Sequence, residues 1–229
     1  MNPRDINIDY DRNGRLGFGE TIFCAQKTVD QIGRILDEVA GRGEPFLLTR
    51  LDEAKFAALD ATHHAALDYD AESHTAFLRF APAPPADALV AVVTAGTSDS
   101  RPAREAMRTL EFHNIGATGF FDVGVAGLWR LMERADEIKR HPVVIAVAGM
   151  DAALPSVLGG LVPGAMIAVP TSTGYGMARD GETALAACLV SCAPGVTVCN
   201  IDNGYGAACA AIRTLGAARM MRDADRTGG

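Results

Sequence analysis

Residues 143–155 read VVIAVAGMDAALP, which is a continuous apolar run, then a small glycine-containing loop, then the start of a helical pattern. An apolar run followed by a small polar loop recurs at residues 166–176 and 196–206. Near-continuous apolar strands are typical of a parallel sheet that is covered on both faces, and the loops that follow such strands lie at its carboxyl edge. These loops are therefore the candidate site around which the chain is organised.

Outward from this stretch the pattern becomes regular. Apolar runs predict strands at Leu89–Thr94, Thr118–Asp122, Val143–Ala148, Met166–Val169 and Val196–Ile201. Helical patterns between and after them cover Pro102–Asn114, Leu128–Lys139, Leu154–Leu161, Thr183–Val190 and Ala207–Met221. This alternation predicts an α/β fold with a three-layer, doubly wound parallel sheet of the flavodoxin or Rossmann type.

Right-handed crossovers bring the strand-to-helix loops of such a sheet to one edge. The loops in question are Ala95–Arg101, Gly124–Gly127, Gly149–Pro155, Pro170–Gly181 and Asp202–Gly206. Their residues can converge although they lie far apart in the sequence.

The first third of the chain is less regular and predicts a small α/β appendage. Thr28 is a plausible N-cap for a helix through Val39, which Gly41 and Gly43 end. Strands are expected at residues 45–51 and 75–80, with one short helix at 53–61, whereas residues 1–25 lack clear periodicity. The proline-rich segment 81–85 favours an extended linker, so we expect two domains, 1–85 and 86–229.

Composition narrows the class of protein. The chain has 229 residues, of which 48% are hydrophobic and 21% charged, with a formal net charge of −7. No apolar run reaches the roughly 18 residues that a membrane span needs, and the N-terminus lacks the apolar core of a secretory signal. An acidic chain also argues against a nucleic-acid partner. We therefore expect a cytoplasmic protein with no membrane and no nucleic-acid partner.

The five cysteines do not predict a disulfide framework or a metal site. Their number is odd and no Cys-x-x-Cys spacing occurs, so reduced thiols are the expectation. No metal-ligand spacing links the histidines, and none of them lies in the strand-edge loops. We expect no bound metal from these residues.

Three glycine-containing loops are candidates for ligand contact. Gly96-Thr97-Ser98-Asp99 follows the first strand of the main domain, where backbone amides and hydroxyls could bind an anion, or where the side chains simply cap a helix. The segments 174–176 and 204–206 both read Gly-Tyr-Gly, which permits close approach of a ligand to the backbone or merely forms a turn.

Two side chains stand out as possible chemical groups. Cys192 lies at a helix end before Ala-Pro-Gly, as a structural thiol or as a nucleophile. Asp151 lies in a strand-edge loop, as the N-cap of the next helix or as a general base that activates water. In the N-terminal segment, Arg12 and Arg15 belong either to a solvated arm or to a site for an anionic group.

These residues resemble known families. The loop 96–99 resembles the Gly-Ser-x-Ser-Asp loop of the PurE family, the N5-carboxyaminoimidazole ribonucleotide mutases. The segment 148–155 resembles that family's Ala-Gly-Arg-x-Ala-His-Leu-Pro loop, but Ala153 stands in place of the mutase histidine.

The longer resemblance, over nearly the whole chain, is to the LarB family, the pyridinium-3,5-biscarboxylic acid mononucleotide synthases of nickel-pincer cofactor biosynthesis. Residues 124–128 (GVAGL), 170–176 (PTSTGYG), 191–195 (SCAPG) and 200–206 (NIDNGYG) look like that family's signatures in its order. Asp9, Arg12 and Arg15 resemble its opening segment. Asp151 stands where glutamate is usual, and Trp129 where histidine is common.

The resemblance implies a PurE-like C-terminal domain and a two-part reaction on nicotinic acid adenine dinucleotide. Cys192 would add to the pyridinium ring so that the ring attacks CO2, and Asp151 would help water cleave the phosphoanhydride, which releases AMP. The positions implied for substrate binding are Asp9, Arg12, Arg15, Gly96, Thr97, Ser98, Asp99, Gly124, Val125, Gly127, Thr171, Ser172, Gly174, Tyr175, Gly176, Asp202 and Asn203.

The same resemblance implies no tightly bound organic cofactor, CO2 or bicarbonate as substrate, Mg2+ as a candidate ion, and a homo-octamer. Two alternatives stay open. One is a PurE-type mutase or carboxylase acting on an aminoimidazole ribonucleotide, against which Ala153 argues. The other is a nucleotide-binding homologue without catalysis, because one fold hosts many functions.

Overall fold

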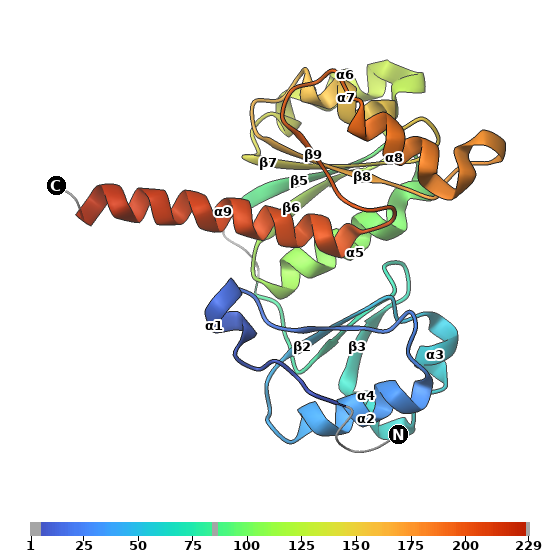
Figure 1. The fold of residues 1–229 in the computed structure, drawn as a ribbon, viewed down its shortest axis with the longest axis vertical. Helices are drawn as coiled ribbons and strands as arrows, with labels where there is room; N and C mark the ends of the chain where they lie inside the picture. Colours follow the sequence, from blue (N-terminus) through green and yellow to red (C-terminus); the bar gives the residue numbers. More distant parts are fainter. Residues whose placement is uncertain (1–5, 84–86, 228–229) are drawn as a thin grey trace. The chain divides into compact units, whose positions relative to one another are not determined.

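The computed structural model describes residues 6–83 and 87–227. The chain divides into two compact units, Met1–Pro82 and Ala83–Gly229, here called the N-terminal and C-terminal units (Figure 1). The boundary expected between residues 85 and 86 lies outside the described residues.

The N-terminal unit is a small α/β structure. Its elements are α1 (Arg12–Leu16), β1 (Thr21–Phe23), α2 (Val29–Ala40), β2 (Phe46–Thr49), α3 (Glu53–Ala57), α4 (Ala61–Ala66), β3 (Leu67–Asp70) and β4 (Thr75–Leu78). The sheet order is β1-β2-β4-β3, with β1 and β2 parallel and the other neighbours antiparallel.

The helix expected after Thr28 is confirmed. Gln31 N donates to Thr28 Oγ1 at 3.2 Å, and Thr28 N donates to Gln31 Oε1 at 2.9 Å, which forms a capping box. The apolar stripe of α2 is buried, so the helix packs against the small sheet through this face.

The expectation of a single helix at residues 53–61 is wrong. The segment forms α3 and then α4, because the backbone of Asp60 is extended and its side chain caps α4, accepting from Thr62 N and His63 N at 2.9 Å each. The elements α1, β1 and β3 are not expected from the sequence, because they are too short to show a periodic pattern.

The C-terminal unit contains the parallel sheet. Its strands are β5 (Ala88–Thr94), β6 (Gly116–Phe120), β7 (Val143–Ala148), β8 (Ala165–Pro170) and β9 (Val196–Val198). Its α-helices are α5 (Ser100–Phe112), α6 (Leu128–Ile138), α7 (Ala153–Gly159), α8 (Glu182–Leu189) and α9 (Gly204–Thr227). All neighbouring strands are parallel, in the order β6-β5-β7-β8-β9.

Two apolar cores lie on the two faces of this sheet. One contains side chains of α6, α7 and α8, and the other contains side chains of α5 and α9. Figure 1 shows the sheet between these two helical layers. All six residues of β7 are buried, because helices cover both of its faces. The expected three-layer, doubly wound fold is confirmed.

Two strand ends differ from the expectation. The expected strand at 118–122 is shifted to Gly116–Phe120, because Asp122 turns away with a φ of 57° and donates its amide to Thr94 Oγ1 at 3.0 Å. The expected strand at 196–201 ends at Val198, after its last pairing with Ala168.

The second Gly-Tyr-Gly segment, residues 204–206, forms the first turn of α9, whereas a loop was expected there. Tyr205 N donates to the buried Glu105 Oε2 at 3.1 Å, and a Cβ at Gly204 would overlap the Pro102 carbonyl oxygen. The glycine therefore allows α5, and not a ligand, to approach the backbone.

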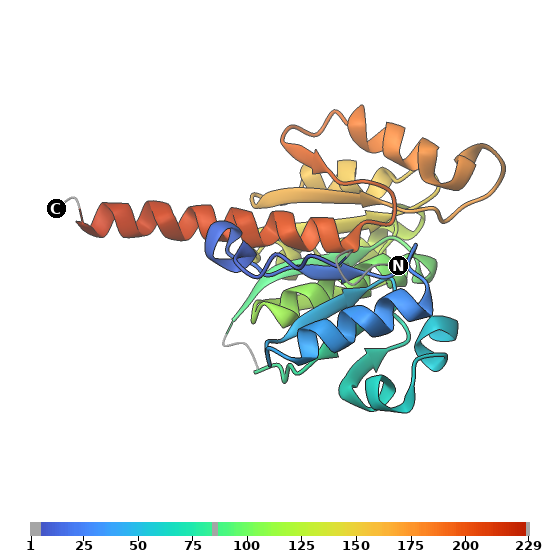
Figure 2. The ribbon, with the colours of Figure 1, turned by 60° about the horizontal axis from the view of Figure 1, so that its bottom comes forward.

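Helix α9 continues past the sheet, so residues 217–226 are exposed (Figure 2). Within residues 6–83 and 87–227, no helix is both long enough and apolar enough to cross a membrane.

The contact between α5 and α9 predicts that Gly204→Ala destabilises the C-terminal unit. The added methyl group must displace the backbone of Pro102, so we expect a loss of about 1–3 kcal/mol in the free energy of unfolding. Urea unfolding followed by circular dichroism measures it. Gly216→Ala in the same helix is the matched control, because a Cβ there meets nothing within 4 Å. Equal stability of the two variants would contradict this packing.

His113, at the end of α5, predicts a pH dependence of stability. Burial lowers the pKa of His113 from 6.5 to about 4. Between these values the unfolded chain binds the proton and the folded chain does not, so stability falls as pH decreases from about 6.5 to about 4. We expect His113→Asn to weaken this dependence, measured as the urea midpoint at about pH 7 and about pH 5. An unchanged difference between the two pH values would contradict the assignment.

Candidate functional site

The strand order of the C-terminal unit places a topological switch point between β5 and β7. The chain leaves β5 toward β6 on one side and continues from β7 toward β8 on the other. In open sheets of this order, ligands bind in the crevice outside the carboxyl ends of the two strands. The loops that follow β5 and β7 are residues 95–99 and 149–152.

Asp99 connects the β5 loop to the β8 loop. Its side chain is 3% exposed; Oδ1 accepts from Thr171 Oγ1 at 2.6 Å, and Oδ2 accepts from Gly96 N at 2.9 Å. Because both carboxylate oxygens bind protein donors, Asp99 shapes the loop from within. The neighbouring Thr97 and Ser98 are exposed, and their hydroxyls make no hydrogen bond within the described residues.

Thr173 connects three loops at once. Its carbonyl accepts from Met150 N at 2.8 Å, and its hydroxyl donates to the Ser98 carbonyl at 3.2 Å. Its amide also approaches Thr171 Oγ1 at 3.3 Å. The loops after β5, β7 and β8 are therefore held together by hydrogen bonds between segments up to 75 residues apart.

Asp202 brings the loop after β9 to the same edge. Its Oδ1 accepts from Ser172 N at 2.9 Å, and its amide donates to the Pro170 carbonyl at 2.9 Å. Asn203 Oδ1 accepts from Gly206 N at 2.8 Å and so stabilises the start of α9. Both side chains hold backbone amides, while Ser172, whose amide Asp202 binds, is exposed.

The loop after β6 approaches from the other side of β5. Gly124 packs against the Ala95 carbonyl, and Val125–Gly127 form one short 3-10 turn before α6. Arg130 Nη1 donates to Asp122 Oδ2 at 2.7 Å, beside Gly127. Arg130 was not among the expected site residues; it is a basic side chain in the first turn of the helix that follows this loop.

The first Gly-Tyr-Gly segment lies in an exposed loop. Gly174 has a φ of 145° and Gly176 a φ of 57°, and Tyr175 between them is 81% exposed. Positive φ angles at both ends turn the tyrosine away from the protein. Its ring is available to stack on a ligand.

Cys192 differs from the other thiols in exposure. It lies in the turn after α8 and is the only exposed cysteine of the five. Burial raises the pKa of Cys188 to about 11 and that of Cys24 to about 12, and it also raises the pKa of Cys199. In the described part of the chain, the Cys192 side chain makes no hydrogen bond or ion pair.

Asp151 lies between two residues with positive φ, Met150 at 57° and Ala152 at 49°. Its Oδ1 accepts from Ala153 N at 3.3 Å, and the side chain is exposed. The N-cap position of α7 is Ala152, so Asp151 stabilises the helix start only through this long hydrogen bond. The carboxylate is left open to solvent or to a ligand.

The three expected residues of the opening segment lie in the N-terminal unit. Asp9 and Arg15 form an ion pair at 2.5 Å, and the hydrogen bond from Arg15 is the main reason that the pKa of Asp9 is lowered. Arg12 Nε is buried and makes no hydrogen bond to another described residue. Arg12 is therefore the better candidate of the two arginines for an anionic group.

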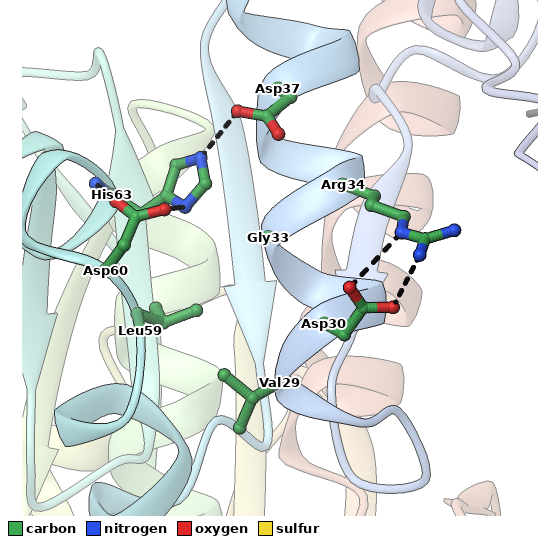
Figure 3. A pocket seen from close by; sticks show the side chains of 8 residues that line it. All are labelled: Val29, Asp30, Gly33, Arg34, Asp37, Leu59, Asp60 and His63. Carbon is green, nitrogen blue, oxygen red and sulfur yellow. Dashed lines mark hydrogen bonds and ion pairs between the residues drawn. The ribbon is translucent and has the colours of Figure 1, made fainter.

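The N-terminal unit also contains a groove of about 200 Å³ between α2 and the α3–α4 segment (Figure 3). His63 lies between Asp37 and Asp60, with a nitrogen–oxygen distance of 2.8 Å to each. Arg34 pairs with Asp30 at 3.1 Å. These polar side chains are paired with one another. The described residues hold no group of three or more His, Cys, Asp or Glu side chains that could bind a metal ion.

Comparisons with known proteins match both units. Residues 4–80 match the family described as the LarB/PurE-like N-terminal domain, and residues 89–224 match the AIR carboxylase family. A protein of Methanocaldococcus jannaschii that is described as uncharacterized is 33% identical over 209 residues, which cover 88% of this chain and 80% of that protein.

The buried contact between Asp99 and Thr171 makes a testable prediction. Thr171→Val keeps the shape of the side chain but leaves Asp99 Oδ1 without its donor, so we expect a loss of about 1–3 kcal/mol in stability. Thr171→Ser keeps the hydroxyl and is the control. Urea unfolding of both variants measures the difference, and a valine variant as stable as the serine variant would refute a structural role for this hydrogen bond.

Proposed function

Because this chain belongs to the LarB family, with a PurE-like AIR carboxylase domain, we propose that it carboxylates the pyridinium ring of nicotinic acid adenine dinucleotide. The same enzyme then hydrolyses the phosphoanhydride, giving pyridinium-3,5-biscarboxylic acid mononucleotide and AMP for nickel-pincer cofactor biosynthesis. Family membership by itself indicates a carboxylase-type enzyme with a nucleotide-type substrate. The substrate, the thiol chemistry and the assembly belong to the proposal.

The observation that carries the proposal is the exposure of Cys192. It is the exposed thiol of the five, in a unit whose strand-edge loops also expose the hydroxyls of Thr97, Ser98 and Ser172. Cys192 itself lies in the turn before β9 and not in a loop that follows a strand. A nucleophile in this reaction must also depart at the end, and a thiolate does both. Cys188 and Cys199 are unsuited, because burial raises the pKa of each thiol.

The carboxylation is balanced without an oxidant or a reductant. The Cys192 thiolate forms a C–S bond to a ring carbon, and the ring electrons neutralise the pyridinium nitrogen. The ring then has an enamine carbon, whose electron pair forms a C–C bond to CO2 and turns it into a carboxylate. That carbon loses its proton to a base, the C–S bond breaks, and the thiolate leaves with its electron pair as the aromatic cation is restored.

Asp151 fits the hydrolytic step. Its exposed carboxylate can accept a proton from water while the water attacks phosphorus and the bond to the AMP oxygen breaks. Its hydrogen bond to Ala153 N keeps it at the edge of the β7 loop. The family's usual glutamate would reach about one methylene further, so the aspartate requires a closer substrate.

The other expected residues would hold the substrate. Thr97, Ser98 and Ser172 offer exposed hydroxyls for anionic groups, and Tyr175 offers a ring for stacking. Gly96, Asp99, Thr171, Asp202 and Asn203 would act through the loops that they hold together. Gly124, Val125, Gly127, Gly174 and Gly176 would contribute backbone.

The proposal also includes the second substrate, the metal ion, the cellular location and the oligomeric state. CO2 or bicarbonate is the second substrate, Mg2+ accompanies the phosphates, and no tightly bound organic cofactor takes part. The enzyme works in the cytoplasm as a homo-octamer, without a nucleic-acid or membrane partner. Exposed apolar side chains on α6 and at the end of α8, among them Trp129 and Val190, support self-association.

A PurE-type reaction on an aminoimidazole ribonucleotide is the second candidate, because the AIR carboxylase family covers residues 89–224. Ala153 occupies the position of the mutase histidine and cannot transfer a proton. A non-catalytic homologue would bind the dinucleotide without product.

The test is turnover of nicotinic acid adenine dinucleotide with 13C-bicarbonate and Mg2+, followed by mass spectrometry. We expect labelled dicarboxylated mononucleotide and AMP from the wild type, and a loss of carboxylation by about 10³-fold or more in Cys192→Ala. Cys209→Ala is the control thiol. AMP without a labelled product would refute the carboxylation, and binding without either product would favour the non-catalytic homologue.

Asp151 is tested by separating the two steps. Asp151→Asn should lower AMP release by about 10²-fold, because the amide accepts no proton, and Asp151→Glu should retain most of the activity. The measurement is the initial rate of AMP formation. Equal rates in the asparagine variant and the wild type would remove Asp151 from the hydrolytic step.

A further inference from the structure

The Cys192 side chain receives no hydrogen bond or ion pair from the described residues. Its sulfur is therefore positioned only by the backbone of the turn that follows α8. The residues that hold this turn decide where the thiol lies.

Two contacts from α7, which lies beside α8 on the same face of the sheet (Figure 1), help to hold the turn. The first is a hydrogen bond of 2.7 Å between Ser156 Oγ of α7 and Ser191 Oγ of the turn. Ser191 Oγ also accepts from Ala193 N at 3.2 Å, which closes the backbone around Cys192. The two hydroxyls and this amide form one short chain of hydrogen bonds.

The second contact is steric. A Cβ at Gly159, one turn further along α7, would lie 2.7 Å from Ala193 Cβ and 3.2 Å from Val196 Cγ2. The turn therefore rests directly on the helix backbone at this point. The residues on both sides of Cys192 are thus held by α7, one by a hydroxyl and one by close packing.

From these contacts we propose that Ser156 is a positioning residue for the Cys192 thiol. Its hydroxyl directs the Ser191 side chain toward Ala193 N and so fixes the backbone that bears the sulfur. The inference deepens the proposed function and rests on it for the role of the thiol. Asp151 lies two residues before α7 and accepts a hydrogen bond from the Ala153 amide, so the same short helix contacts both groups' segments.

The position of the thiol matters because covalent catalysis requires precise geometry. Reacting atoms must lie about 3–3.5 Å apart with aligned orbitals, and a displacement of about 1 Å can lower the rate by about 10²-fold. Without the Ser156 hydroxyl, Ser191 can rotate away from Ala193 N, and the turn gains alternative conformations. Substrate binding by the other loops is unaffected, since Ser156 belongs to none of them.

The test compares Ser156→Ala and Ser156→Thr with Thr214→Ala, because among the described residues the Thr214 hydroxyl bonds only to the Ala210 carbonyl of its own helix. The first readout needs no substrate: the rate at which iodoacetamide alkylates each cysteine, resolved by peptide mass spectrometry at several pH values. We expect Ser156→Ala to alkylate Cys192 about threefold faster, because the loosened turn admits the reagent from more directions, with Cys199 and Cys209 unchanged. Ser156→Thr should restore the wild-type rate.

The second readout is turnover of nicotinic acid adenine dinucleotide. Ser156→Ala should lower kcat for carboxylation about tenfold with little change in KM. Thr214→Ala should match the wild type in both readouts. Opposite effects on alkylation and on carboxylation are the signature of positioning, since general damage exposes all the cysteines together.

Two outcomes overturn the inference. One is an unchanged alkylation rate of Cys192 in Ser156→Ala, and the other is an equal rise at Cys192, Cys199 and Cys209. A third outcome separates the inference from the proposed function. If the wild type does not turn over the dinucleotide but Ser156→Ala still changes the alkylation rate of Cys192 alone, the proposed function is refuted and the positioning of the thiol stands.

Discussion

The hydrogen bond between Thr171 Oγ1 and Asp99 Oδ1, at 2.6 Å and almost fully buried, is the contact on which the strand-edge loops depend. A buried carboxylate requires partners for both oxygens, and here Thr171 and Gly96 N supply them. These two hydrogen bonds connect the end of β8 to the loop after β5. Thr173 and Asp202 then add the loops after β7 and β9.

In this arrangement, the polar residues that hold the loops are different from the residues proposed to react. Asp99, Asp202 and Asn203 bind amides and hydroxyls of the protein, so their polarity serves the loops themselves. Cys192 and Asp151 make few or no such bonds and are exposed. Loops held in this way, with a few uncommitted groups nearby, suit the proposed reaction, which needs a nucleophile and a base at fixed places.

Helix α7 contacts the segments that carry both groups proposed to react. It is only seven residues long, yet its first amide, Ala153 N, donates to Asp151, and Ser156 and Gly159 hold the turn of Cys192. Its buried residues Leu154 and Leu158 fix it on the sheet. The hydrophobic core thereby reaches both proposed chemical groups through a single rigid element.

The sequence by itself determined the α/β architecture, because strand burial and helix periodicity are properties of local patterns. It also predicted the strand-edge loops, with Asp151, as candidates, because small residues follow each apolar run, and Cys192, because it lies at a helix end before Ala-Pro-Gly. The tertiary structure alone decided which polar groups are used internally. Asp99 and Thr171 are 72 residues apart, and Ser156 and Ser191 are 35 apart, so no local pattern pairs them. It also decided that Gly204 lies against α5, and that α3 and α4 are separate helices. Packing between distant segments and a single capping side chain override the local pattern at these places.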